Sequence, residues 1–182
     1  MKRIALFLLG VMAVSTSALA QAPADPIETA LLALPANLRA DATVIKWKSD
    51  YTYDTLKKGT NGLVCYDRSG FPQQQPFSIQ CTSIANLDRE VQNLKAEAAG
   101  DRTKSEAILN AMEKDGTRAK PAYGSVWYHV AGADRERARP HMTVAMPGAT
   151  AQSTGLPDKR TQDGVWIMNA GTSTAHLMVP GE

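Results

Sequence analysis

Strand-like segments lie toward both ends of the chain, and two helical segments lie between them. The helical segments repeat apolar residues every three or four positions, whereas the strand-like segments are rich in β-branched and aromatic residues. The join between the helices is short, which favours a helix hairpin. This order predicts an α+β fold with the hairpin packed on one face of a mostly antiparallel sheet. The predicted helices are 83–99 and 103–115, and the predicted strands are 43–48, 51–56, 63–66, 124–130, 141–146, 165–169 and 174–179.

Capping patterns predict where the helices begin. Asp25 can cap a helix whose first residue is Pro26, and this helix should stop at Pro35. The run Thr103–Glu106 has the pattern of a capping box for the second helix of the hairpin. The residues of that helix expected to face inward are Ala107, Ile108, Ala111 and Met112.

The turn residues between the first strands predict their connection. Asn61 and Gly62 form the strongest short signal for a β-hairpin. Residues 43–66 are therefore expected to form a three-stranded meander. The next segment, residues 67–80, is rich in glycine, proline and glutamine and is expected to be a surface loop.

The N-terminal segment has the composition of a secretory signal peptide. Lys2 and Arg3 precede an apolar run over residues 4–14, and Ala18-Leu19-Ala20 resembles a cleavage site. The apolar run is too short to span a bilayer stably. We expect residues 1–20 to be removed and residues 21–182 to form a single α+β domain. The mature protein should be exported, periplasmic or secreted, with no membrane span after signal cleavage.

The charge of the mature chain argues against nucleic acid as a partner. The chain has 20 basic and 18 acidic residues, and loss of Lys2 and Arg3 leaves 18 of each. Binding to nucleic acid requires clustered positive charge, which a near-neutral chain does not predict.

Cys65 and Cys81 are the two cysteines of the chain. In an oxidising compartment such a pair favours a disulfide, which would stabilise the fold by roughly 3 kcal/mol by closing a loop of this size. The alternative is a pair of thiolate metal ligands. Because the 15 residues 66–80 separate the cysteines, in place of a C-x-x-C spacing, the thiolate alternative is the weaker interpretation.

Three motifs resemble a family of small secreted bacterial proteins that is uncharacterised and carries no established activity. They are Gly59-Thr60-Asn61-Gly62 followed by Cys65, Pro140-His141-Met142 followed by Pro147, and Gly171-Thr172 followed by His176-Leu177-Met178-Val179-Pro180. The resemblance covers most of the mature chain. It implies export but no chemistry, so a function must be inferred from the residues.

Histidine and methionine occur together in two strand-like segments that end at proline, residues 140–147 and 174–180. Successive side chains of a strand point to opposite faces. In the first segment His141 therefore faces away from the apolar residues, and in the second His176 and Met178 do so. If the two strands are neighbours, these three side chains can converge on one face.

This grouping predicts a copper site as one alternative. Imidazole binds Cu(II) and thioether selects Cu(I), so His141, His176 and Met178 are the candidate metal ligands. The simpler interpretation is that the methionines fill the core and that each histidine makes only a backbone hydrogen bond.

The main prediction for function is a non-catalytic module that binds an unknown small ligand or a protein. The candidates to line its cleft are Trp47, Trp127, Trp166 and the five tyrosines. A secreted hydrolase is a second alternative, because serines and His176 are present. It has little support, since the chain lacks both the G-x-S-x-G and the H-E-x-x-H pattern. No catalytic residue and no certain cofactor are predicted.

Overall fold

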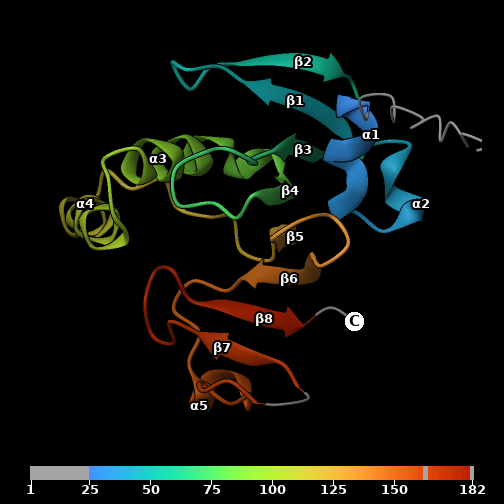
Figure 1. Cartoon of the computed structure of the whole chain (residues 1–182). Coiled ribbons are helices and arrows are strands. Elements are labelled where there is room, and N and C mark those ends of the chain that lie inside the picture. Colours follow the sequence, from blue (N-terminus) through green and yellow to red (C-terminus); the bar gives the residue numbers. More distant parts are fainter. Residues whose placement is uncertain (1–24, 162–163, 181–182) are drawn as a thin grey trace, which may run out of the picture.

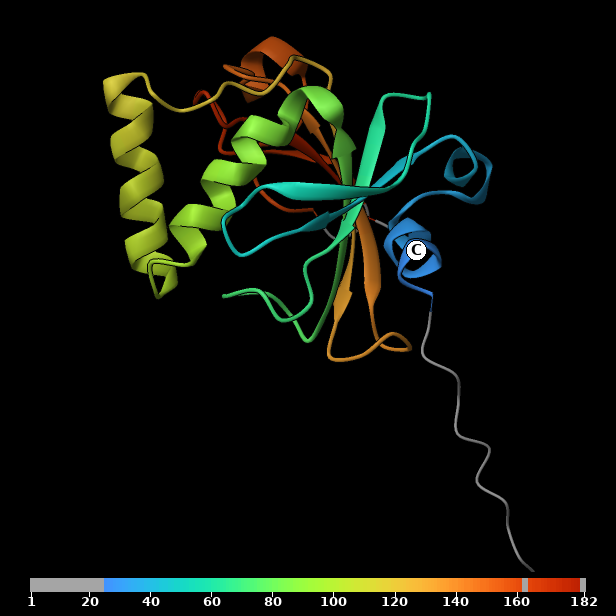
Figure 2. The same cartoon turned by 90° about the horizontal axis from the view of Figure 1, so that it is seen from above.

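The structure is a computed structural model that describes residues 25–161 and 164–180. The predicted signal peptide, residues 1–20, lies outside the described residues. The fold consists of one eight-stranded sheet with helices on both faces (Figures 1 and 2). No described helix has both the length and the apolar character needed to cross a membrane.

The sheet is mostly antiparallel, which confirms the predicted α+β class. Its strand order is β2-β1-β3-β4-β5-β6-β8-β7, and among the described strands only β1 and β3 pair in parallel. The strands are β1 Thr43–Trp47, β2 Tyr53–Lys57, β3 Leu63–Asp67, β4 Phe77–Ser83, β5 Val126–Gly132, β6 Arg139–Ala145, β7 Trp166–Met168 and β8 His176–Pro180.

The predicted meander over residues 43–66 is wrong, because β1 lies between β2 and β3. After β2 the chain runs back past the start of β1, where the Thr60 and Asn61 amides donate to the Asp41 carbonyl at 2.7 and 3.1 Å. Gly59 is required at this crossing, since a Cβ there would lie 2.2 Å from the Asp41 carbonyl oxygen. The side-chain amide of Asn61 also donates to the Leu38 carbonyl at 2.9 Å. The asparagine therefore anchors a crossover and does not form a hairpin turn.

The expected loop over residues 67–80 is only partly a loop. Its last residues belong to β4, which pairs with β3 on one side and β5 on the other. Ser78, Ile79 and Gln80 are consequently buried. The sequence did not predict this strand because the segment is rich in proline and glutamine. Gln80 can nevertheless be buried, because its side-chain amide forms hydrogen bonds with Arg68 and Tyr66.

The predicted disulfide is confirmed. Cys65 of β3 and Cys81 of β4 lie directly opposite each other, with a Cα–Cα distance of 4.0 Å. Both sulfurs lie in the core formed between the sheet and the first helices, together with Leu31, Leu34 and Ile79.

Helices cover the two faces of the sheet unequally (Figure 2). One face carries the short helices α1 Pro26–Ala30, η1 Leu31–Ala33 and α2 Ala36–Arg39. The other carries η2 Ile84–Asn86 and α3 Leu87–Glu97, with α4 Arg102–Asp115 packed outside α3. A further short helix, α5 Ala151–Thr154, lies between β6 and β7. Asp25 caps α1 as predicted, accepting from the Ile27 amide at 2.9 Å.

The inward face predicted for α4 is wrong. The N-cap is Asp101, two residues before the expected capping box, and Ala107, Ile108 and Ala111 are exposed. Ser105 is the buried residue, because its hydroxyl donates to the Asp101 carbonyl at 2.8 Å and accepts from the Gln73 amide at 2.6 Å. Polar contacts with the 68–76 loop thus decide which side of α4 is inside.

Candidate functional site

A cavity of about 290 Å³ lies on the α3 face of the sheet, and all three histidines of the chain line it. Its floor is formed by β4, β5 and β6, and one wall by α3. The segment between α4 and β5 contributes Arg118 and Pro121. The turn between β7 and β8 contributes Asn169, Thr174 and Ala175.

Strand alternation explains why these side chains meet. On β5, Trp127 and His129 face the cavity, whereas Tyr128 and Val130 pack against the first helices on the opposite face. On β6, His141 and Thr143 face the cavity. The face predicted for His141 is therefore the one observed.

His129 and His141 form a cross-strand pair. They are directly opposite in the β5–β6 register, and their rings are stacked with centroids 5.0 Å apart and an interplanar angle of 28°. Burial, helped by the nearby His141 and Arg68, lowers the pKa of His129 to about 3. Burial and the neighbouring His176 also lower the pKa of His141. Both imidazoles are thus neutral at pH 7 and keep a nitrogen lone pair.

β8 lies next to β6, and His176 lines the same cavity as His141. The expected juxtaposition of the two strands is therefore present. In register, however, His176 is opposite Ala145 and His141 is opposite Pro180, so the two histidines are four residues apart, roughly 13 Å along the strands. His176 also makes the backbone hydrogen bond of the simpler interpretation, with Nδ1 2.8 Å from the Thr174 carbonyl oxygen.

Met178, the third predicted copper ligand, is opposite Thr143 of β6 and Trp166 of β7. It is not one of the residues that line the cavity. Within residues 25–161 and 164–180, no three His, Cys, Asp or Glu side chains are grouped closely enough to hold a metal ion. A copper site at His141, His176 and Met178 stays a prediction.

A buried ionic cluster forms the wall between α3 and the sheet. Glu90 is 1% exposed, and its Oε1 accepts from Trp127 Nε1 at 2.7 Å and from Asn93 Nδ2 at 3.0 Å. Arg68 forms an ion pair with Glu97 and donates to Gln80 Oε1 at 3.0 Å. Although burial alone would lower the pKa of Arg68, the carboxylates of Glu90 and Glu97 raise it above its ordinary value. These contacts hold Trp127 and Gln80 rigidly at the cavity floor.

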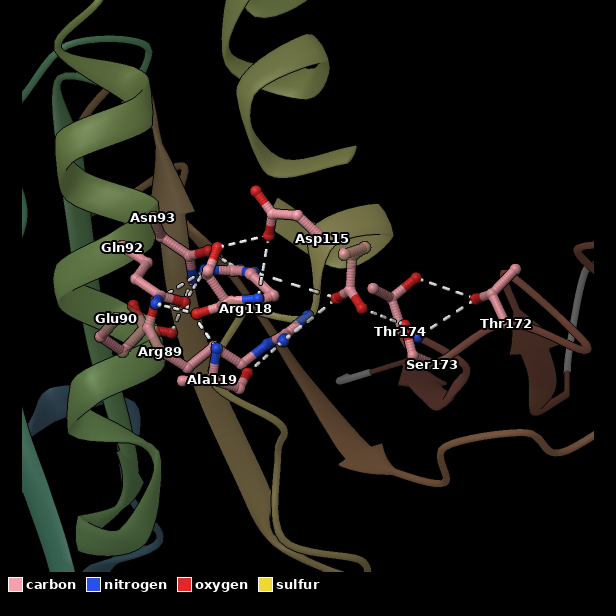
Figure 3. Close-up of polar contacts among 12 residues, drawn as sticks. Arg89, Glu90, Gln92, Asn93, Asp115, Arg118, Ala119, Thr172, Ser173 and Thr174 are labelled. Atoms are coloured by element: carbon pink, nitrogen blue, oxygen red, sulfur yellow. Dashed lines mark hydrogen bonds and ion pairs between the residues drawn. The ribbon is translucent and has the colours of Figure 1, made fainter. Parts of the chain in front are cut away.

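A second cluster connects α3 with the cavity mouth (Figure 3). Arg118 donates to the Arg89 carbonyl at 3.2 Å and to Gln92 Oε1 at 3.0 Å. Glu113 Oε1 lies 3.5 Å from Arg89 and 4.0 Å from Arg118, and its Oε2 accepts from the Ser173 hydroxyl at 2.5 Å. Burial, together with the adjacent Arg89, lowers the pKa of Arg118 to about 10. The turn between β7 and β8 is thereby attached to the helix layer.

The charges around the cavity balance. Three arginines line it, Arg68, Arg89 and Arg118. Three glutamates, Glu90, Glu97 and Glu113, lie beside them, so the formal charges of the six side chains cancel. The groups available for a ligand are polar but uncharged. Within the described part of the chain, the side chains of His129, His141, Thr143 and Asn169 make no hydrogen bond to another protein group.

Sequence patterns missed the ionic wall of the cavity. Arg68 and Gln80 stand in the segment taken for a loop, and Arg118 follows the last predicted helix. One signal was present: Glu90 lies between Leu87 and Leu94 on the inward stripe of α3, where an acid is unusual. Of the three tryptophans expected to line a cleft, Trp127 does so, whereas Trp47 is in the core and Trp166 lies on the edge strand β7.

Comparison of the chain with protein-family models, curated proteins and solved structures finds no match. The resemblance to a secreted bacterial family therefore stays a prediction, and no function is transferred from a relative.

Proposed function

We propose that this protein is an exported, non-catalytic module that binds a small polar molecule in the histidine-lined cavity. The observation that carries the proposal is the convergence of uncharged hydrogen-bonding side chains, from β5, β6 and the β7–β8 turn, on a cavity of about 290 Å³. Ligand sites typically combine a concave surface with a few polar groups of this kind. The Cys65–Cys81 disulfide is compatible with an oxidising compartment.

Size and charge indicate the class of ligand. The cavity is at the lower end of the range for small-molecule sites, which begins at about 300 Å³. Because the surrounding arginines and glutamates cancel, a molecule with net charge gains no net Coulomb attraction. The ligand should therefore be a neutral or zwitterionic molecule of the size of an amino acid or a monosaccharide. Trp127 offers an apolar ring beside the polar groups.

A thermal-shift screen of the purified protein against neutral and zwitterionic amino acids, monosaccharides and small amides tests this proposal. A ligand present at 100 times its Kd stabilises the folded state by about 2.7 kcal/mol. That should raise Tm by roughly 5–10 °C for a protein of this size.

Thr143→Val removes a hydroxyl that faces the cavity while nearly conserving side-chain volume, so the shift should shrink. Thr55→Val, at an exposed position of β2, is the matched control and should leave the shift unchanged. If no compound raises Tm, or if Thr143→Val and Thr55→Val respond alike, the cavity is not the ligand site.

Copper binding is the second candidate function. The observation that favours it is the pairing of β6 with β8, which brings His141 and His176 to one cavity. With Met178 as a third ligand this site would bind Cu(I) or Cu(II).

A further inference from the structure

We propose that His129 and His141 together bind one transition-metal ion of the class that prefers imidazole, such as copper, nickel or zinc. This inference rests on the proposed function only in using the same cavity. It differs from the copper candidate above in its ligands, because it requires His129 and does not require His176 or Met178.

The cross-strand position of the two rings is the first support. Two metal–nitrogen bonds of about 2.1 Å keep their nitrogens within about 4 Å of each other. Rings whose centroids are 5.0 Å apart can reach that separation. The observed planes differ by 28°, so the rings must turn about their Cβ–Cγ bonds to aim at a common point. This torsion has a broad energy profile, so the adjustment is small.

The unused hydrogen-bonding capacity of the pair is the second support. Metal ions bind imidazole through a lone pair on a ring nitrogen. Within the described residues neither ring has a hydrogen-bond partner, so coordination breaks no interaction of the protein. The coordination positions that the protein leaves open face the cavity, where water or a small ligand can occupy them.

The surrounding charges permit a cation at this place. The guanidinium of Arg68 lines the same cavity and would repel a metal ion. Its charge is offset by the ion pair with Glu97 and by the nearby carboxylate of Glu90. Glu90 Oε2, which has no hydrogen-bond partner among the described residues, leaves one buried carboxylate oxygen unsatisfied beside the cavity.

His176 provides an internal control. It lines the cavity but is four residues from His141 in the β6–β8 register, and its Nδ1 is engaged by the Thr174 carbonyl. A site built on the stacked pair should not need it.

Titration of chelator-treated protein with Cu²⁺ tests the inference, since Cu²⁺ binds such sites most tightly among the divalent ions. Tryptophan fluorescence reports binding, because Trp127 lines the cavity two residues from His129. We expect a Kd tighter than roughly 100 µM, with one ion per chain. His129→Gln and His141→Gln should each weaken binding at least about tenfold, and His176→Gln and Met178→Leu should not.

A measurement on the unaltered protein guards against variants that fail to fold. In NMR spectra recorded with Zn²⁺, the imidazole signals of His129 and His141 should shift together and those of His176 should not. Absence of Cu²⁺ binding in the wild type, or affinity that falls in His176→Gln but not in His129→Gln, overturns the inference. The screen of metal-free protein against organic compounds is independent, so the proposed function and the metal site can fail separately.

Discussion

His129 shows how strongly a single position depends on its surroundings. The residue lies in the middle of β5, half-buried, with His141 stacked on its ring and Arg68, Glu90 and Trp127 around the same cavity. Burial and the positive charge of Arg68 both oppose protonation, and His141 adds to the effect. The imidazole therefore remains a neutral hydrogen-bonding group over a wide range of pH.

This environment predicts loss of stability in mild acid. Above pH 6.5 the imidazole is neutral in both the folded and the unfolded chain and contributes no pH dependence. Between pH 6.5 and about 3 the unfolded chain binds a proton that the folded chain excludes, so the free energy of unfolding falls as the pH falls. Because His129 is only half-buried, the expected slope is roughly 1 kcal/mol per pH unit, less than the full value for a buried group.

Urea unfolding of the metal-free protein at about pH 7.5, 6.0 and 4.5 measures the free energy of unfolding at each pH and so checks this prediction. His129→Gln should lose less stability between pH 6.0 and 4.5 than the wild type, since glutamine does not titrate. Thr55→Val should follow the wild type. Equal slopes for His129→Gln and the wild type would mean that other groups account for the acid sensitivity.

At the scale of the elements, β3 and β4 hold the centre of the molecule. β4 pairs with strands on both sides, and the disulfide joins it to β3 beneath the first helices. The opposite face of the same two strands carries Tyr66 and Gln80, which support the ionic wall of the cavity. One strand pair therefore serves both the apolar core and the candidate site.

Removal of the disulfide should lower stability without changing the fold. The double variant Cys65→Ala/Cys81→Ala frees a loop of 16-residue separation in the unfolded chain. The expected loss is about 3 kcal/mol, or a decrease in Tm of roughly 6–12 °C. Calorimetry measures the change, and far-UV circular dichroism checks that the fold is retained. An unchanged Tm would show that the bridge does not constrain the unfolded chain.

At the scale of the whole molecule, the cavity lies where the helix layer ends. Helices α1 to α4 cover the part of the sheet around β1, β3 and β4, whereas β6, β8 and β7 extend beyond these four helices (Figure 1). All residues of β5 are half-buried, because this strand lies at the edge of the area that the helices cover. Glu113 of α4 connects α3 with the β7–β8 turn, because it contacts Arg89, Arg118 and Ser173.

This connection predicts that Glu113 controls the mobility of the cavity mouth. Glu113→Gln removes the carboxylate shared by two buried arginines, Arg89 and Arg118, and weakens the contact to Ser173. The free energy of unfolding should fall by roughly 1–3 kcal/mol. Amide hydrogen exchange of residues 172–174 should become faster. Glu136→Gln, at an exposed position between β5 and β6, is the control and should change neither quantity. Unchanged exchange in Glu113→Gln would mean that the turn is held by its own hydrogen bonds.

Much of the fold could be predicted because the relevant signals are short. Capping by Asp25, the assignment of two helices between strands and the face of His141 all depend on residues close in sequence. The predictions for the meander, the 67–80 loop and the inner face of α4 failed for one common reason. Asp41, Gln73 and Arg68 act across long stretches of chain to place Gly59, Ser105 and Gln80, and no local period encodes these contacts.

The chain itself determined the class of fold, the disulfide and the side of each strand on which a histidine lies, because strand alternation and capping are local properties of the backbone. Tertiary structure alone decided that β5 pairs with β6 in the register that stacks His129 on His141. It also decided that α3 brings Glu90 onto the sheet beside them. Such choices arise from packing and hydrogen bonding between distant segments, and the cavity exists only once those segments have come together.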